Sequence, residues 1–214
     1  MKLSIMIATV GERNERFIRL LDALLPQTTN DVEVIAYWDN FEKSLGDKRQ
    51  DILESAKGEY VCNVDDDDMV PEYYCEEILK AIKTKPDYVG WNMKYYEDGV
   101  LDRPVIHSLR FDKWWQDEQG YYRNVSHLNP IKRKIALKVP FSIPRGQAED
   151  VPWVSRVAPH VKTEVFIEKP MYYYYHKHAD TVWVIGYTPQ VGKYTRPIIN
   201  NKHFRYHPNS KETN

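Results

Sequence analysis

Apolar positions in the first hundred residues follow two different periods, one typical of strands and one typical of helices. Short continuous apolar runs predict buried strands at residues 3–9, 32–38, 60–64 and 88–96. Apolar side chains at helical spacing predict helices over residues 16–25, 44–57 and 71–83, between those strands. Strands and helices that alternate in this way are typical of an open α/β sheet, here mixed but mainly parallel and flanked by helices.

Helix boundaries in this region have recognisable signals. Pro26 ends the first helix, and Ser44 with Asp47 resembles a capping box that opens the second. We expect Gly58 to stop the second helix and Pro71 to be the first residue of the third.

The second half of the chain is less regular. Its patterns predict strands at 103–111 and 163–175 and short helices at 129–139 and 150–157. Beyond about Lys193 the chain is polar and resembles a tail or a lid. We therefore expect one domain with a regular half (1–100), an irregular half (101–192) and a polar C-terminal segment (193–214).

Charge and cysteine content narrow the function classes. The 214 residues have a net charge of -1, which disfavours wholesale coating of nucleic acid, and no apolar run is long enough for a membrane span. The apolar start is too short for a signal peptide. Cys62 and Cys75 have no disulfide or metal-binding spacing, so we expect buried free thiols in a reducing compartment and a cytoplasmic protein, in a host cytoplasm if the source is viral.

The small net charge hides an asymmetry between the two halves. Residues 1–100 carry 12 basic and 21 acidic side chains, a balance of -9, whereas residues 101–214 carry 18 and 10, a balance of +8. An acidic first half suits metal binding and a basic second half suits an anionic partner, although the two halves could simply neutralise each other.

Four successive aspartates, Asp65 to Asp68, follow the third predicted strand. If the strand continues, Asp65 and Asp67 share one face and Asp66 and Asp68 the other. Carboxylates about 6–7 Å apart repel by roughly 1–3 kcal/mol, so such a run in a cleft needs a cation or raised pKa values. Oxygen ligands favour Mg²⁺ or Mn²⁺. Ligands bind at the carboxyl ends of strands in α/β sheets, where Asp39 also lies; the alternative is a solvated acidic turn.

The order of these pieces resembles glycosyltransferase family 2, whose members have the GT-A fold. The similarity lies in the sequences LSIMIAT (3–9), GDKRQ (46–50), AKGEY (56–60) and VDDDD (64–68), in a helix with Leu20, Leu21 and Leu24, and in Gln27. It covers roughly residues 3–82 and continues weakly to Asp150. Gln50 departs from the family, which commonly has Asn there.

The resemblance implies a role for each matching residue in binding a nucleotide-diphospho-sugar, most simply a UDP-sugar. Asp39 would contact the nucleobase or ribose, Asp65 the ribose, and Asp67 the divalent metal that bridges the diphosphate. Other donor contacts implied by position are Thr9, Arg13, Lys48, Arg49 and Asp66. The alternative for Lys48 and Arg49 is a solvated helix face.

Glycosyl transfer also needs a base that deprotonates the acceptor hydroxyl. Residues 145–150, RGQAED, look like the Glu-Asp segment that holds the family's catalytic carboxylate, so Asp150 would be the base and Glu149 the second choice. An ordinary acidic residue in the first turn of a helix is the structural alternative.

Aromatic and histidine residues supply further candidates. His176 and His178 could add metal ligands, although surface histidines beside an aromatic strand are the simpler interpretation. Trp114 and Trp115 could stack on sugar or base rings or anchor a loop, and the basic stretch with His127 and Lys132 could shape the acceptor side.

These features lead to the hypothesis of a metal-dependent glycosyltransferase, inverting by analogy with the family, with Mn²⁺ or Mg²⁺ as cofactor. The basic second half suggests an anionic acceptor, such as a hydroxymethylated base in phage DNA, which would need extrusion from the duplex, or a cell-surface glycan that carries phosphate. A nucleotidyltransferase is disfavoured because only one glycine, Gly11, follows the first strand. Two competing hypotheses are a two-metal phosphoesterase and a non-catalytic domain that binds sugar or nucleic acid.

Overall fold

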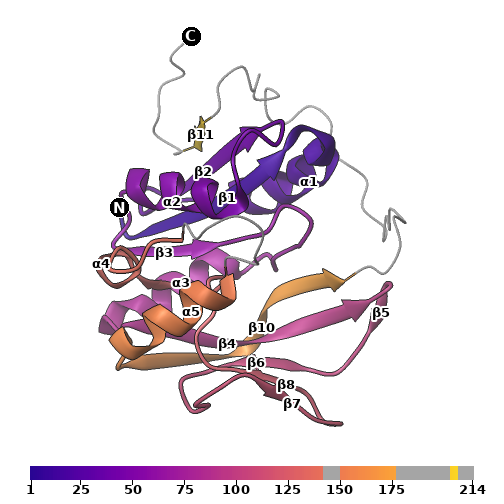
Figure 1. Ribbon diagram of the computed structural model, residues 1–214, viewed down its shortest axis with the longest axis vertical. Helices are drawn as coiled ribbons and strands as arrows, with labels where there is room; N and C mark the ends of the chain where they lie inside the picture. The colour runs from indigo at the N-terminus through magenta and orange to yellow at the C-terminus, as the bar shows by residue number, and fades with distance from the viewer. Residues whose placement is uncertain (142–149, 177–202, 207–214) are drawn as a thin grey trace.

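A computed structural model describes residues 1–141, 150–176 and 203–206. In these residues one mixed sheet is flanked by helices on its two faces (Figure 1). The strands are β1 (Leu3–Val10), β2 (Val32–Asp39), β3 (Tyr60–Asn63), β4 (Tyr88–Glu97), β5 (Val100–Leu101), β6 (Val105–His107), β7 (Trp115–Gln116), β8 (Tyr121–Arg123), β9 (Ile131–Lys132), β10 (Glu164–His176) and β11 (His203–Tyr206). The helices are α1 (Asn14–Leu24), α2 (Leu45–Ser55), α3 (Tyr74–Ala81), α4 (Arg133–Ala136) and α5 (Asp150–Val157).

Strand direction brings the important carboxyl ends to one edge of the sheet. β1 runs parallel to β2 and β3, β9 is antiparallel to both β3 and β4, and β10 is parallel to β4. Strands β1 to β4 and β10 therefore all point the same way, as Figure 1 shows. The long ladders are parallel and the short strands β5, β7, β9 and β11 add antiparallel pairs, so the expected mixed, mainly parallel α/β sheet is confirmed.

Two apolar clusters cover the faces of this sheet. One contains Phe17 of α1 and Ile78 of α3, packed against β1 and β4, and the other contains Ile52 of α2 and Trp153 of α5. The indole ring of Trp153 stacks on Phe141 with ring centroids 4.4 Å apart. This packing fixes α5 beside the sheet, so its first residue has a defined place.

Helix boundaries mostly follow the sequence signals, with two differences. The hydroxyl of Ser44 accepts a hydrogen bond from the backbone nitrogen of Asp47, as a capping residue should. However, α2 ends at Ser55, before Gly58, whose role is close approach: a Cβ there would lie 2.5 Å from the backbone nitrogen of Ser4. α3 begins at Tyr74 rather than at Pro71, because Pro71 lies in a turn whose carbonyl accepts from Tyr74.

The second half differs more from expectation. The strand expected at 103–111 is shortened to β6, and the helix expected at 129–139 is divided between β9 and α4. The helix expected at 150–157 is confirmed as α5, and β10 lies within one residue of its expected bounds. Short strands of two or three residues depend on their partners rather than on their own pattern, which explains the errors.

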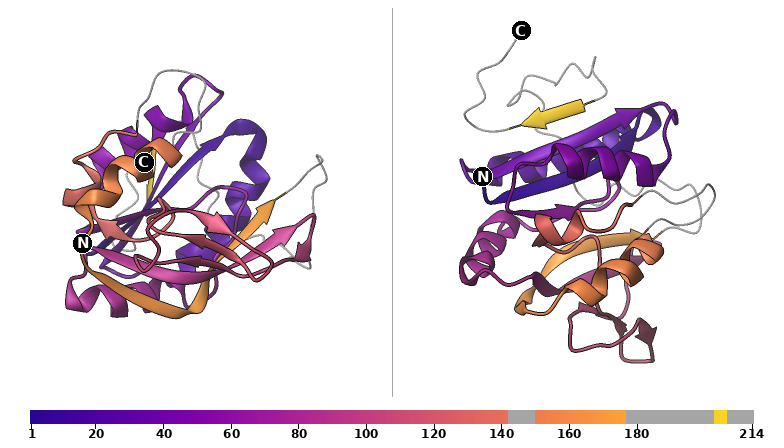
Figure 2. Two further views of the ribbon diagram at one scale, coloured as in Figure 1. Left: turned by 60° about the horizontal axis from the view of Figure 1, so that its bottom comes forward. Right: turned by 60° about the vertical axis from the view of Figure 1, so that its left-hand side comes forward.

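Residues 203–206, within the segment expected to be a polar tail or lid, form β11. This strand pairs antiparallel with β2 at the outer edge of the sheet (Figure 2). Arg205 donates to the carboxylate of Glu33 at 2.9 Å and to the carbonyl of Ser55 at 2.6 Å. Among the described helices, none combines the length and apolar character that crossing a membrane requires.

Candidate active site

The aspartate run lies just beyond the carboxyl end of β3, in a turn that we call the acidic turn (Asp65–Asp68). β3 ends at Asn63, and the backbone nitrogen of Asp68 donates to the carbonyl of Asp65 at 3.1 Å. The strand therefore does not continue through the aspartates, so the alternation expected of a strand does not apply. The expected grouping of the side chains, Asp65 with Asp67 and Asp66 with Asp68, is nevertheless found. Asp66 and Asp68 are buried, whereas the side chains of Asp65 and Asp67 are 30% and 31% exposed.

The two buried carboxylates hold the turn in place. Asp66 accepts from the hydroxyl of Thr9 at 2.7 Å and from Arg13 at 2.9 Å. Asp68 accepts from the hydroxyl of Tyr172 and from the backbone nitrogen of Tyr175, both at 2.9 Å. Hydrogen bonds thus hold the turn to β1 on one side and to β10 on the other.

The pKa values of these carboxyl groups diverge. Burial raises the pKa of Asp66 in spite of its bonds to Thr9 and Arg13. Burial, with repulsion from Asp65 and Asp67, raises the pKa of Asp68 well above its usual range. Burial also opposes ionisation of Asp65, but Arg49 and the nearby His127 outweigh it and hold the pKa of Asp65 well below normal. The turn therefore presents charge at Asp65 and suppresses it at Asp68.

Lys48 and Arg49 are not a solvated helix face, because both point inwards from α2 and are nearly fully buried. The ammonium of Lys48 pairs with Asp39 and donates to the carbonyl of Thr9 at 3.1 Å. The guanidinium of Arg49 pairs with Asp65 at 2.6 Å. Lys48 thus contacts the protein rather than an open crevice, and Arg49 contacts the partly exposed Asp65.

Asp39 is equally enclosed. Besides Lys48, its oxygens accept from the backbone nitrogens of Phe41 at 3.1 Å and Lys43 at 2.9 Å. Burial acts to raise the pKa of Asp39, but these donors together lower it below its ordinary value. In this conformation Asp39 organises the loop after β2 and the position of Lys48, and a direct contact with a nucleobase or ribose would require that loop to open.

Three arginines that the sequence analysis did not group face the acidic turn from α1 and the residue before it. Arg13 lies 3.3 Å and Arg16 3.7 Å from the carboxylate of Asp67, and Arg19 donates to the carbonyl of Asp67 at 3.4 Å. Their spacing of three residues places them on one helical face, a signal that was available in the sequence. About half of the Arg13 side chain is exposed, so the three arginines form a positively charged surface beside Asp67.

Asp150 is the first residue of α5, and its carboxylate accepts from the backbone nitrogen of Val151 at 2.8 Å. Tyr174 of β10 connects it to the acidic turn. Burial raises the pKa of Tyr174 to about 12, helped by the negative charges of Asp68, Asp65, Asp67 and Asp150. Tyr174 thus lies within electrostatic range of both, a relation that the sequence pattern of this strand did not indicate. Glu149 lies outside the described residues.

Candidate ligands for a metal are only partly brought together. His176 ends β10 and its ring stacks with Tyr95 at 6.1 Å and Tyr174 at 6.4 Å; His178 is outside the described residues. Within the described ranges no three His, Cys, Asp or Glu side chains form a cluster that could cage a metal. The carboxylate of Asp67 is accessible and could bind a divalent ion. A diphosphate would supply most of the other oxygen ligands of that ion, and the described residues fit such an arrangement.

The two residues expected to shape the acceptor side from the basic stretch lie at opposite ends of the sheet. The carbonyl of His127 accepts from the backbone nitrogen of Asn63, next to the acidic turn. Lys132 pairs with Tyr60 at the start of β3, and its ammonium contacts Asp87 at 2.9 Å. The structure therefore places His127 at the site and Lys132 away from it.

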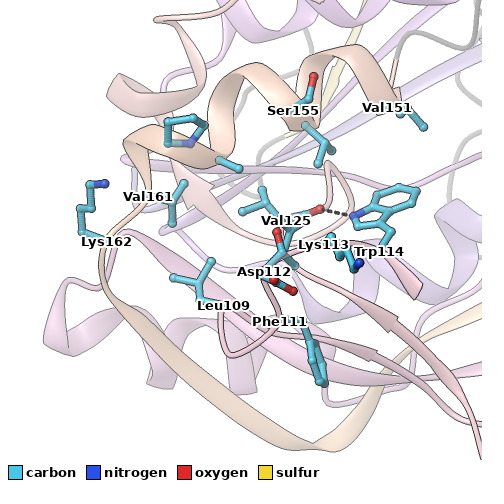
Figure 3. A pocket seen from close by; sticks show the side chains of 14 residues that line it. Leu109, Phe111, Asp112, Lys113, Trp114, Val125, Val151, Ser155, Val161 and Lys162 are labelled. Atoms are coloured by element: carbon cyan, nitrogen blue, oxygen red, sulfur yellow. Dashed lines mark hydrogen bonds between the residues drawn. The ribbon is translucent and has the colours of Figure 1, made fainter. Parts of the chain in front are cut away.

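Trp114 and Trp115 do not form an exposed pair. Trp115 stacks on Tyr122 at 4.0 Å in the β7–β8 hairpin. Trp114 is half-buried, donates from Nε1 to the carbonyl of Val125 at 3.3 Å, and lines a hollow of about 670 Å³ beneath α5 (Figure 3). Val151, next to Asp150, also lines this hollow. Trp114 is therefore the better placed of the two for an acceptor.

Gln50, where the sequence departs from the family pattern, has a structural role. Its Oε1 accepts from the backbone nitrogen of Phe141 at 2.9 Å, and its Nε2 donates to Glu54 at 2.7 Å. This side chain therefore ties α2 to the residue on which Trp153 stacks.

Comparison with known proteins agrees with this architecture. Residues 40–141 match the family "Glycosyl transferase family 2". Three crystal structures of S. aureus TarS 1-349 share the fold. The TM-score is 0.63 at 18% sequence identity for the first, 0.64 at 17% for the complex with UDP, and 0.63 at 16% for the complex with UDP-GlcNAc. The alignments cover 82%, 82% and 84% of this chain but only 60%, 61% and 60% of those chains. No curated protein matches significantly. Just under half of the chain thus matches glycosyl transferase family 2, and the described residues share the fold of the TarS structures.

Proposed function

We propose that this chain transfers a sugar from a nucleoside-diphospho-sugar to an acceptor hydroxyl, and that transfer depends on a divalent metal. The observation that carries the proposal is the accessible Asp67 carboxylate beside Arg13 and Arg16, on a turn held rigidly by Thr9 and Tyr172. Similarity of fold to a TarS chain crystallised with UDP and with UDP-GlcNAc supports a UDP-sugar as donor.

The chain's own residues divide the work as follows. Asp65, ionised beside Arg49, accepts a hydrogen bond from a hydroxyl of the donor, and Arg13 binds diphosphate oxygens. Asp67 would hold Mn²⁺ or Mg²⁺, with His176 or His178 as a further ligand. A metal in this place supplies positive charge for the diphosphate as it leaves. Lys48 and Asp39 hold the floor of the site.

Asp150 is the proposed base. It takes the proton from the acceptor hydroxyl as that oxygen attacks the anomeric carbon, and a single displacement of this kind inverts the configuration. Glu149 remains the second choice. Trp114 and the hollow beneath α5 receive the part of the acceptor that lies beyond its hydroxyl.

The acceptor we propose is anionic, since basic side chains predominate in residues 101–214. A hydroxymethylated base in phage DNA is the first candidate and a phosphate-bearing cell-surface glycan the second. The buried free thiols of Cys62 and Cys75 fit a reducing, cytoplasmic setting. Acceptor DNA binding that ignores salt concentration would contradict the first candidate.

Substitution of Asp67 gives the decisive test. Sugar release from UDP-sugars with Mn²⁺ or Mg²⁺ should fall by roughly a thousandfold or more in Asp67→Ala. The reason is that the Asp67 carboxylate would position the metal whose positive charge stabilises the leaving diphosphate. A chelator should reduce the wild-type chain to the same level. Asp31→Ala, a similarly exposed aspartate paired with Lys2, is the matched control. Full activity in Asp67→Ala would refute the proposal, and calorimetry with UDP would separate it from a non-catalytic binding domain.

A further inference from the structure

His127 is a buried histidine whose ring has no hydrogen-bond partner among the described residues. Its exposed fraction is 6%, and both Nδ1 and Nε2 are buried without a partner there. Leaving buried polar atoms unpaired is unfavourable, and such atoms in native proteins usually meet water or a ligand. The imidazole can therefore bind a partner other than the described residues.

A second buried histidine shows the contrast. His107 also lies inside the protein, but its Nδ1 is 2.6 Å from Oδ1 of Asn129, and burial lowers its pKa to about 4. That ring is a satisfied core histidine. His127 belongs to a different class, because its position is fixed through the backbone: its carbonyl accepts from the backbone nitrogen of Asn63 at 3.0 Å and from the Asn63 side chain at 3.3 Å.

The ring of His127 faces Asp65. Nε2 lies 4.0 Å from Oδ2 of Asp65, which is too long for a hydrogen bond. The other carboxylate oxygen of Asp65 is taken by Arg49 at 2.6 Å. A hydroxyl group that reached both atoms could accept from Nε2 and donate to Oδ2.

Strand order indicates which part of the donor supplies that hydroxyl. Thr9 lies near the end of β1, the acidic turn follows β3, and His127 precedes β9. These strands lie in the order β2-β1-β3-β9-β4. In the proposed function Arg13, at the end of β1, binds the diphosphate, whereas β9 lies on the other side of β3, next to β4, with which β10 and its Tyr174 pair. We propose that His127 and Asp65 together bind a hydroxyl of the sugar that is transferred, and that His127 thereby helps to select the donor sugar.

This inference rests on the proposed function, and calorimetry can separate the two. The probes are UDP and whichever of UDP-glucose, UDP-galactose and UDP-GlcNAc the wild-type chain binds most tightly. His127→Phe keeps an aromatic ring, although a larger one, and removes both nitrogens. It should weaken sugar-nucleotide binding by about five- to tenfold, the effect of one lost hydrogen bond, and change UDP binding by less than twofold.

Two further variants complete the test. His127→Gln restores a side-chain donor and should recover part of the lost affinity, and it replaces His127→Phe if that variant does not fold. His160→Phe, at an exposed histidine, is the matched control and should change neither affinity. Equal losses for UDP and the sugar nucleotide, or no loss for either, would overturn the assignment and leave a buried water as the partner of His127. Absence of UDP binding to the wild-type chain would instead refute the proposed function, and the assignment with it.

Discussion

Charged side chains around β1–β3 are buried in pairs, whereas those around β6–β8 lie over aromatic rings nearer the surface. In the first region Lys48 meets Asp39 and Arg49 meets Asp65, and both cations are nearly fully enclosed. In the second, Arg103 lies 4.5 Å from the ring centroid of Tyr121, and Arg123 lies 5.0 Å from that of Trp114.

This difference determines which substitutions each region tolerates. Removing one partner of a buried ion pair leaves an uncompensated charge, which costs several kcal/mol, whereas an exposed cation on a ring contributes about 0.5–1 kcal/mol. The proposed donor side is therefore rigid and part of the fold, and the proposed acceptor side can vary with little loss of stability. Substitutions at Asp150, at the Asp39–Lys48 pair and at the two tryptophans can break or sharpen this comparison.

The largest effect is expected from Asp150→Asn. Loss of the proposed base should lower kcat by roughly 10²- to 10⁴-fold, while affinity for the donor and the free energy of unfolding change little. Transfer assays at saturating donor, with calorimetry and chemical denaturation, measure all three quantities. Asp31→Asn, at an exposed aspartate that pairs with Lys2, is the control. A large loss of stability in Asp150→Asn would mean that this residue serves the fold and not the chemistry.

The next effect concerns stability. Asp39→Asn should reduce the free energy of unfolding by about 3 kcal/mol at neutral pH, because Lys48 stays buried without its counter-charge. Replacing both, in Asp39→Asn with Lys48→Met, should cost less than the sum of the two single changes. Strict additivity would show that the pair is not coupled.

The pH dependence of that loss has a definite sign. Since the pKa of Asp39 is lowered in the folded chain, its contribution is present above the unfolded value of about 3.9 and disappears as pH falls below it. The stability difference between wild type and Asp39→Asn should therefore shrink in acid. Denaturation curves at several pH values below about 5 test this, and a constant difference would contradict it.

The smallest effects distinguish the two tryptophans. Trp114→Phe should lower kcat/KM for the acceptor by roughly three- to tenfold, because it loses the bond to Val125 and reshapes the hollow beneath α5. Trp115→Ala should change it by less than twofold, since Trp115 stacks on Tyr122 and meets the edge of Phe111 but does not itself line the hollow. Acceptor titrations at fixed donor compare them, and a larger effect at Trp115 would move the acceptor surface to β7–β8.

Local signals in the sequence were sufficient for much of the fold. The apolar runs of β1 and β2 and the cap at Ser44 act over short distances, so their elements form where the pattern predicts them. The strand at 103–111 was overestimated because the length of β6 depends on pairing with β4 and β8.

The candidate site was predictable in place but not in detail. The carboxyl-end rule located Asp39 and the acidic turn at one edge, since it depends only on chain direction. It could not show that Lys48 pairs with Asp39, or that Lys132 lies at the other end of β3, because both facts depend on which side chains meet across strands. Arg16 and Arg19 were visible as a helical stripe, but only the fold shows that the stripe faces Asp67.

The pairing of β11 with β2 has a consequence for the molecule's behaviour in solution. An outermost strand with free backbone groups is a template on which another chain can add, a common route to aggregation. Here residues 203–206 already occupy the hydrogen-bonding groups of β2, and Arg205 is clamped to Glu33. A chain cut before residue 203 would expose that template together with the Glu33 carboxylate, and would be more prone to self-association than the chain that retains it.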